Sequence, residues 1–265
     1  MAMWLRMAML MLAVLMAGPM RAAAAPDYAY PAIAKEGAAL DAFLPPGWTV
    51  AMRTAGDLNR DSIDDVAAVL EAGEKATHRR GCKADAFESG AAPRILVILL
   101  GKPGGGFTLA AQENQLPARA DEGGVFGDPL ENLTIERGTL LLHHYGGSAW
   151  RWSIGFRFRQ QDGGWFLIGY TEEHYHNVSQ YVRRYDYNTL TSKIEVTSTG
   201  EDGKPGCRSC LEGESCPKTP ACRPGEKKMP KETVLLAAPK RPLLALKDVF
   251  CAQDLGKLLP VVGER

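Results

Sequence analysis

Hydrophobic side chains occupy every second position over ten residues near the middle of this chain. The hydrophobic positions are Trp150, Trp152, Ile154, Phe156 and Phe158. The positions between them hold small or basic residues, namely Arg151, Ser153, Gly155, Arg157 and Arg159. A period of two predicts a β-strand with one face packed on a core and the other in contact with water. One-sided strands of this kind are typical of antiparallel sheets.

The neighbouring sequence extends this prediction to an antiparallel meander. Residues 131–135, 140–145, 165–170 and 192–197 read as further strands. Turn residues separate them at Glu136-Arg137-Gly138, at Asp162-Gly163-Gly164 and at residues 188–191. We read the first turn as three residues long, with Gly138 at a positive φ. Together these patterns predict a mainly β fold, either partly propeller-like or a sandwich.

The first hundred residues show a second group of elements. Residues 34–43 predict a short N-terminal helix that ends before Pro45-Pro46-Gly47. Strands are predicted at 48–53 and 66–70, and a hairpin at 94–100 and 107–111 around Gly104 to Gly106. Residues 72–93 have no period and are predicted to form an inserted loop.

An acidic loop lies between the first two of these strands. Oxygen-bearing side chains fall at positions 1, 3, 5 and 9 of this loop, which are Asp57, Asn59, Asp61 and Asp65. Ile63, at position 7, can supply its backbone carbonyl. Calcium prefers six to eight oxygen ligands, and alternate residues of a tight loop supply them. Position 6 of such loops favours glycine, which adopts the left-handed conformation freely. This chain has Ser62 there, and the replacement costs about 1 kcal/mol. The sequence predicts a calcium site here, and the alternative is an acidic surface turn.

The loop and its surroundings resemble one FG-GAP/VCBS repeat, the unit of integrin-type β-propellers. The resemblance covers residues 47–112 and rests on Gly56 to Val66 and on Ile95 to Phe107. It implies that the loop joins two strands of a blade and binds calcium. Residues 43–48 and 146–152 are also similar to exported bacterial proteins of unknown function that carry a single such unit. No second copy of the loop occurs, and a closed propeller needs several blades.

The ends of the chain predict its compartment and domain organisation. Residues 1–25 contain Arg6, a short apolar run and a small-residue tract, which are typical of a cleaved signal peptide. The mature chain then contains no predicted membrane span, and the expected location is periplasmic or secreted. We divide it into a β domain at 26–199, a Cys-rich segment at 200–232 and a C-terminal return segment at 233–265 that packs on the β domain. The chain has 31 basic and 31 acidic residues, which does not indicate a nucleic-acid partner.

All six cysteines lie in the mature part of the chain: Cys82, Cys207, Cys210, Cys216, Cys222 and Cys251. An even number in an exported protein favours disulfide bonds, and six cysteines allow 15 pairings. The 207–222 group therefore predicts a disulfide-rich loop. A zinc site and a redox pair at Cys207 and Cys210 are alternatives, although a redox pair needs a helix N-terminus that this Pro/Gly-rich segment does not predict.

Two further groups are candidate sites. Glu172, Glu173, His174 and His176 lie close in sequence, and His143 or His144 on a nearby strand could complete a metal site. The strand residues Trp150, Arg151, Trp152, Arg157 and Arg159 form a possible ligand surface. No catalytic residues are assigned, since Ser148 lacks the strand–turn–helix context of a nucleophile elbow and Gly104 to Gly106 do not precede a helix.

The sequence therefore predicts an exported, calcium-binding β protein in which calcium is structural. It would act as a binding module for an unidentified protein or glycan. The alternative is a periplasmic metal-dependent enzyme that uses the Glu172, Glu173, His174 and His176 group. No reaction can be read from the sequence itself.

Overall fold

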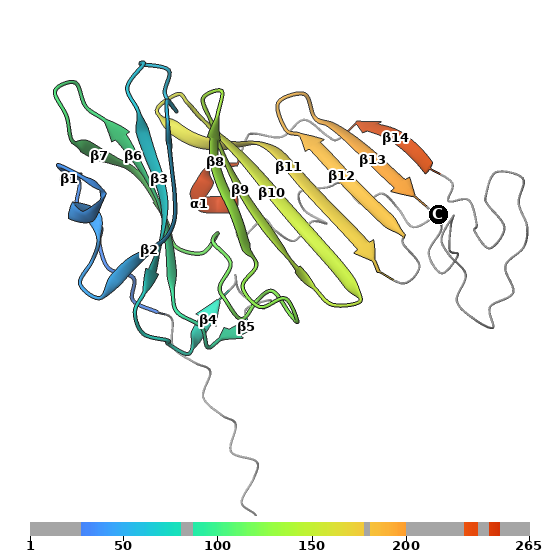
Figure 1. The fold of residues 1–265 in the computed structure, drawn as a ribbon. Helices are drawn as coiled ribbons and strands as arrows, with labels where there is room; N and C mark the ends of the chain where they lie inside the picture. Colours follow the sequence, from blue (N-terminus) through green and yellow to red (C-terminus); the bar gives the residue numbers. More distant parts are fainter. Residues whose placement is uncertain (1–27, 81–86, 178–180, 200–230, 238–243, 250–265) are drawn as a thin grey trace, which may run out of the picture.

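The computed structural model describes residues 28–80, 87–177, 181–199, 231–237 and 244–249. These residues form three antiparallel sheets and confirm the predicted mainly β class (Figure 1). The six cysteines lie outside the described residues, as do residues 200–230 of the Cys-rich segment predicted at 200–232. So do the signal-like residues 1–25.

The first sheet has five strands in the order β1-β7-β6-β3-β2. Its strands are β1 (Glu36–Gly37), β2 (Trp48–Gly56), β3 (Asp65–Ala72), β6 (Arg94–Gly101) and β7 (Phe107–Glu113). The strands predicted at 48–53, 66–70, 94–100 and 107–111 are confirmed, each with one to three extra residues at an end. The acidic loop connects β2 to β3.

The second sheet has seven strands in the order β14-β13-β12-β11-β10-β9-β8, a meander that follows the chain. Its strands are β8 (Leu130–Glu136), β9 (Thr139–Gly147), β10 (Trp150–Gln161), β11 (Gly164–His176), β12 (Val182–Asn188), β13 (Lys193–Thr199) and β14 (Lys231–Ala237). The predicted meander is confirmed, but β12 was not predicted. Its sequence has only Tyr185 and Tyr187 packed toward the core, so its alternation is weak.

The turn between β8 and β9 is shorter than the sequence predicts. Only Arg137 and Gly138 lie between the strands, with φ of 52° and 72°. Two positive φ values are characteristic of the type I′ hairpin, whose twist matches that of the flanking strands. The positive φ expected at Gly138 is therefore confirmed, while the three-residue length is wrong.

Two predictions about the N-terminal part are wrong. Residues 40–43 form only a short 3-10 helix, η1 (Leu40–Phe43), because Glu36 and Gly37 pair with β7 instead of joining a helix. Gly37 lies so close to Phe43 that an added Cβ would be 2.7 Å from its ring. The predicted loop at 72–93 contains a two-stranded sheet, β4 (His78–Arg80) and β5 (Phe87–Ser89).

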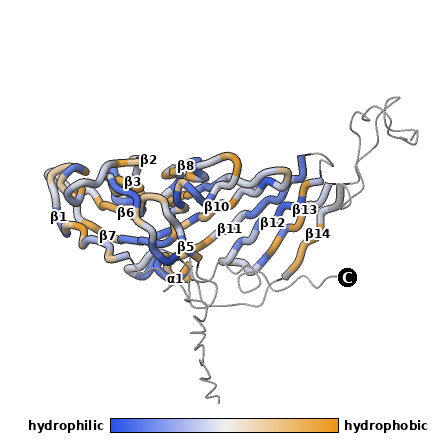
Figure 2. Tube along the Cα trace, turned by 90° about the horizontal axis from the view of Figure 1, so that it is seen from below, coloured by the Kyte–Doolittle hydropathy of each residue, from blue (hydrophilic) through white to orange (hydrophobic). Residues whose placement is uncertain are grey.

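The main core lies between the two large sheets. Ala67, Val69, Leu96 and Ile98 of the five-stranded sheet pack against the inner face of the seven-stranded sheet. The opposite face of the five-stranded sheet is also buried, under Ile33, Leu40 and Phe43. The outer face of β8 to β12 has no such cover among the described residues, and hydrophilic and hydrophobic positions mix along these strands (Figure 2).

The short helix α1 (Leu246–Val249), near the C-terminus, packs against the main core. Leu246 and Val249 are buried, and the N–H of Leu167 donates to the carbonyl of Leu244 at 2.9 Å. In the described part of the chain, no helix combines the length and apolar character that a membrane crossing requires.

Candidate functional site

The acidic loop is closed by its own backbone amides. The Asp57 carboxylate accepts N–H groups of Arg60 (2.5 Å), Asp61 (3.2 Å) and Ser62 (3.0 Å). Asn59 Oδ1 accepts the N–H of Asp61 at 3.0 Å, and Asp61 Oδ1 accepts the N–H of Ile63 at 2.8 Å. The side chains at positions 1, 3 and 5 therefore all turn into the loop.

The backbone of the loop takes the left-handed conformation at two residues without a glycine. Arg60 has φ of 67° and Ser62 has φ of 70°. The conformation expected at position 6 is therefore present at Ser62. Residues with a Cβ adopt it at a cost of about 1 kcal/mol each, and the hydrogen bonds of Asp57 offset this cost.

Asp65, at position 9, anchors the loop to the sheet. Its side chain is fully buried, and its two oxygens accept the N–H groups of Leu58 (2.8 Å) and Gly101 (2.9 Å). Burial raises the pKa of Asp65, while the two amides lower it. The nearby charge of Asp61 raises the pKa further. Asp65 is thus a buried anion that gains from any cation placed in the loop.

The donor set of the loop fits a hard cation in its chemistry. Asp57, Asn59 and Asp61 provide carboxylate and amide oxygens, and each oxygen has a second lone pair beyond its amide bond. No Lys, Arg or His of the described residues forms an ion pair with Asp57, Asp61 or Asp65. Across those same residues, no three His, Cys, Asp or Glu side chains form a ready-made metal cluster. Any calcium would therefore depend on Asn59 and the Ile63 carbonyl as well as carboxylates.

The group of acidic and histidine residues on β11 is divided between two faces of the sheet. Tyr170, Glu172 and His174 lie on the inner face, where Glu172 accepts hydrogen bonds from the Tyr170 hydroxyl at 2.9 Å and from His174. Glu173 lies on the outer face, 3.9 Å from Arg184. The structure therefore brings together two of the four predicted residues.

The two histidines of β9 do not complete that group. His143 lies on the outer face and contacts Glu131 at 2.5 Å. His144 faces inward in one row with Ile154 and Glu172, so it is separated from Glu172 by strand β10. His144 is buried and its Nε2 accepts the N–H of Ala118 at 3.2 Å. Burial lowers the pKa of His144 to about 3, so its ring is neutral.

The predicted Trp/Arg strand presents its two residue types on opposite faces. Trp150 lies on the inner side near His176, with ring centroids 4.7 Å apart, and Trp152 shares that side. Arg151, Arg157 and Arg159 lie on the outer face. The five residues therefore do not form one surface.

Arg151 belongs instead to an aromatic platform that sequence reasoning missed. Its guanidinium lies 4.9 Å from the ring centre of Phe126 and 5.8 Å from that of Tyr175. Phe126 lies 5.4 Å from the Tyr145 ring, and Arg151 donates to the Tyr145 hydroxyl at 3.3 Å. We call these four residues the aromatic platform. Phe126 comes from the segment before β8, which carries no periodic signal in the sequence.

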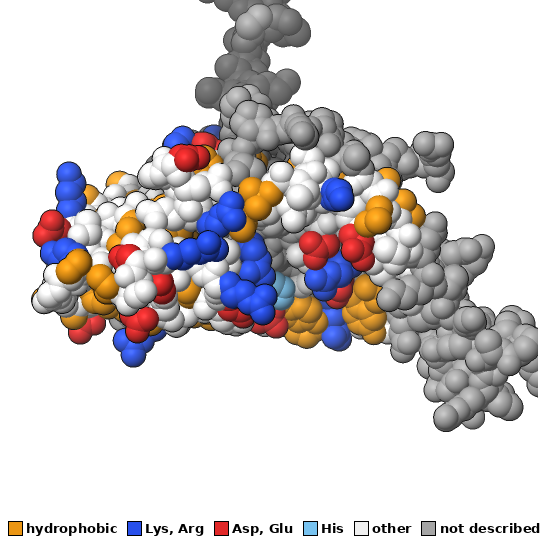
Figure 3. All heavy atoms as spheres, turned by 90° about the horizontal axis from the view of Figure 1, so that it is seen from above, with side chains coloured by type: hydrophobic (Ala, Val, Ile, Leu, Met, Phe, Trp, Pro, Cys, Tyr) orange, Lys and Arg blue, Asp and Glu red, His pale blue; other side chains and the backbone are white. Residues whose placement is uncertain are grey.

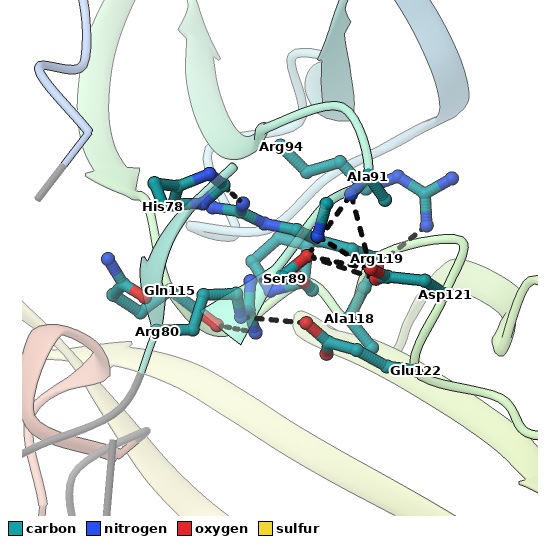
Figure 4. A network of polar contacts seen from close by, with 12 residues as sticks. His78, Arg80, Ser89, Ala91, Arg94, Gln115, Ala118, Arg119, Asp121 and Glu122 are labelled. Carbon is teal, nitrogen blue, oxygen red and sulfur yellow. Dashed lines mark hydrogen bonds and ion pairs between the residues drawn. The ribbon is translucent and has the colours of Figure 1, made fainter. Parts of the chain in front are cut away.

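Three buried arginines hold that segment in place (Figure 4). Arg94 contacts Glu71 and Asp128 and donates to the carbonyl of Ala118 at 2.6 Å. Arg80 donates to the carbonyls of Pro117 (3.1 Å) and Gln115 (2.7 Å). These bonds tie residues 115–128, the segment that contains Phe126, to the strands.

The third arginine, Arg119, is fully buried next to Tyr30 and His78. Its Nη1 lies 2.9 Å from His78 Nδ1, and its Nη2 donates to the Tyr30 hydroxyl. Burial lowers the pKa of Arg119 to about 10. Figure 4 shows Asp121 on the adjacent segment directed toward Ser89 and Ala91, where it accepts the N–H of Ala91 at 3.2 Å. Sequence reasoning missed all three arginines, since only Arg94 borders a recognisable strand.

A comparison of the chain with protein-family models, with curated proteins and with solved structures found no match.

Proposed function

We propose that this chain is an exported, calcium-stabilised β module that binds a glycan through the aromatic platform. The observation that carries the proposal is the exposure of Phe126 beside Arg151. Phe126 is 45% exposed and its neighbour Val125 is 76% exposed, while the core of the same sheet buries its aromatics. Exposed rings fixed beside a cation are an arrangement that ligand surfaces use.

The composition of the platform supports a glycan over an apolar partner. Phe126 offers a ring face, while Tyr145, Tyr175 and Arg151 offer hydroxyl and guanidinium groups within the same few residues. A sugar ring presents both C–H faces and hydroxyls, so it can stack and form hydrogen bonds at once. A protein partner is the alternative.

Calcium has a structural role in this proposal. Asp57, Asn59, Asp61 and the Ile63 carbonyl would hold the ion, and Asp65 would gain from its charge. The ion supplies positive charge to a loop whose carboxylates form no ion pair among the described side chains. The loop would then keep the strand connection of an FG-GAP-like unit. Export through the signal-like residues 1–25 and disulfide bonds among the six cysteines belong to the same proposal.

Thermal unfolding of residues 26–265 tests the calcium part. Several millimolar calcium should stabilise the protein by about 1–2 kcal/mol relative to EGTA, as expected for a millimolar to submillimolar site. Asp61→Ala should abolish this increase. Asp64→Ala is the matched control, since Asp64 is exposed and lies outside the ligand positions. No calcium-dependent shift in the native protein would refute the ion site.

Glycan binding is tested by screening neutral and acidic oligosaccharides against the same protein. Phe126→Ala and Tyr175→Ala should each reduce the affinity for a bound glycan about tenfold, the effect of losing one stacking contact. Leu190→Ala is the control, because Leu190 is equally exposed at 45% but lies in the β12–β13 turn. Binding that survives both platform substitutions, or an absence of glycan binding, would contradict the proposal.

A further inference from the structure

Three arginines that form no ion pair among the described residues line two adjoining hollows at the β8–β9 turn. The larger hollow, of about 710 Å³, is lined by Glu136, Arg137 and Arg157. The second, of about 490 Å³, is lined by residues of the acidic loop and the same turn: Gly56, Asp57, Arg60, Ile135, Arg137 and Gly138. Arg137 belongs to both, so the hollows are neighbours. We call Arg60, Arg137 and Arg157 the arginine triad.

We propose that the arginine triad binds the phosphate or sulfate groups of a ligand. A guanidinium donates two parallel hydrogen bonds to an oxyanion, which makes arginine the preferred partner of such groups. None of the three arginines forms an ion pair with a carboxylate of the described residues. The chain as a whole carries no net charge, so three guanidinium groups close to one turn are a local concentration of positive charge.

Each arginine is placed by a different element of the fold. Arg157 Nη1 donates to Thr139 Oγ1 at 3.0 Å, and that hydroxyl donates to the Glu136 carbonyl at 2.7 Å. Arg137 stands at the tip of the type I′ turn. The side chain of Arg60 lies directly over Gly138, where an added Cβ would be 2.9 Å from Arg60 Nε. Three separate elements therefore place arginine side chains along the two adjoining hollows.

The two acidic residues of the hollows leave the triad an excess of positive charge. Asp57 directs its carboxylate at the N–H groups of Arg60, Asp61 and Ser62. Glu136 is exposed and forms no ion pair with the described residues. In Figure 3, Lys and Arg side chains gather near the centre of the face shown, with Asp and Glu side chains beside them.

The triad lies apart from the aromatic platform on the outer face of the seven-stranded sheet. Arg151 and Arg157 point to the same side of β10 six residues apart, which corresponds to about 20 Å along a strand. Binding of phosphate or sulfate at the triad can therefore be tested separately from glycan binding at the platform.

Calorimetric titration with inorganic phosphate, sulfate and pyrophosphate tests the proposal. Buffers should be freed of calcium by a chelating resin, because a soluble chelator is itself a polyanion, and ionic strength should be held constant with sodium chloride. We expect pyrophosphate to bind one to one and more tightly than phosphate, since its two groups reach both hollows. Comparison of phosphate with sulfate identifies the preferred oxyanion.

Substitutions in the triad then distinguish a site from general attraction. Arg137→Asn should weaken pyrophosphate binding at least about tenfold while keeping a residue that tolerates a positive φ. Arg157→Gln should have a similar effect. Arg159→Gln is the matched control, on the same strand and face but outside both hollows, and should change affinity less than about twofold. Circular dichroism confirms that each variant is folded. No binding at 10 mM, taken as roughly the weakest useful affinity, or equal losses in Arg137→Asn and Arg159→Gln, would overturn the proposal.

Discussion

The two large sheets differ in how many of their faces are covered. In the five-stranded sheet, neighbouring residues of β6 such as Ile98 and Leu99 are both fully buried, although they point to opposite sides. In the seven-stranded sheet, Phe158 is fully buried while the next residue, Arg159, faces outward. An antiparallel sheet can leave one face in contact with water. In the five-stranded sheet, residues 33–43 cover that face. Both proposed binding surfaces include an arginine from the open face of the seven-stranded sheet, Arg151 in the platform and Arg157 in the triad.

The sharpest test of this comparison uses the two neighbouring pairs. Ile98→Ala and Leu99→Ala should each lower the free energy of unfolding by about 2–5 kcal/mol, because each leaves a cavity in a packed layer. Phe158→Ala should cost about 3–5 kcal/mol, whereas Arg159→Ala should stay near 0.5 kcal/mol or less. Urea unfolding of the four variants measures these values. A small loss at Leu99 would show that residues 33–43 do not seal the outer layer.

The connection between β2 and β3 provides the next largest effect. Asp65→Ala leaves the N–H groups of Leu58 and Gly101 without their acceptor, which should cost about 2–4 kcal/mol. Asp64→Ala removes an exposed carboxylate one residue earlier and should change stability by less than about 0.5 kcal/mol. Both unfolding curves should be recorded without calcium. Equal effects would mean that the buried anchor contributes little.

The free energy of unfolding should depend on pH through the His144 ring of the seven-stranded sheet. Its folded pKa is lowered to about 3 by burial, so between pH 6.5 and 3 the unfolded chain binds the extra proton. Stability should therefore fall as the pH decreases below 6.5, with a slope that approaches about 1.4 kcal/mol per pH unit. His144→Gln keeps an acceptor for Ala118 and should flatten the slope between pH 7 and 5. An unchanged slope would contradict this assignment.

The smallest expected effect concerns the loop backbone. Ser62→Gly should raise the free energy of unfolding by about 1 kcal/mol, because glycine adopts φ of 70° without steric cost. Ser153→Gly, in the extended strand β10, should instead lower it by about 0.5–1 kcal/mol. Thermal unfolding of both variants tests the contrast. A loss at Ser62 would mean that its side chain contributes more than its conformation costs.

The strands could be predicted where burial imposes a clear pattern. Continuous apolar runs identified β3 and β6, and alternation identified β10, because each pattern reports directly on covered faces. Strand β12 escaped prediction because only its two core-facing tyrosines carry the signal. The helix predicted at 34–43 failed because pairing of Glu36 with β7 overrides local helix propensity.

The candidate sites divide in the same way. The acidic loop is local, so its spacing predicted the turned-in side chains and the left-handed Ser62. The aromatic platform and the arginine triad combine residues from segments far apart in the chain. Arg60 meets Gly138, and Phe126 meets Arg151, only after the sheets have packed. A single sequence does not indicate which of its distant residues come into contact.

The chain-order pairing of β8 to β13 has a consequence for folding kinetics. Each of these strands pairs with its immediate neighbour, so each contact closes a short loop and costs little chain entropy. Strand β3 must instead find β6 across the segment that contains β4 and β5. Rates of formation fall as the sequence separation of contacts grows. The meander is therefore expected to form early, hairpin by hairpin, and to serve as the template on which the five-stranded sheet completes its slower pairing.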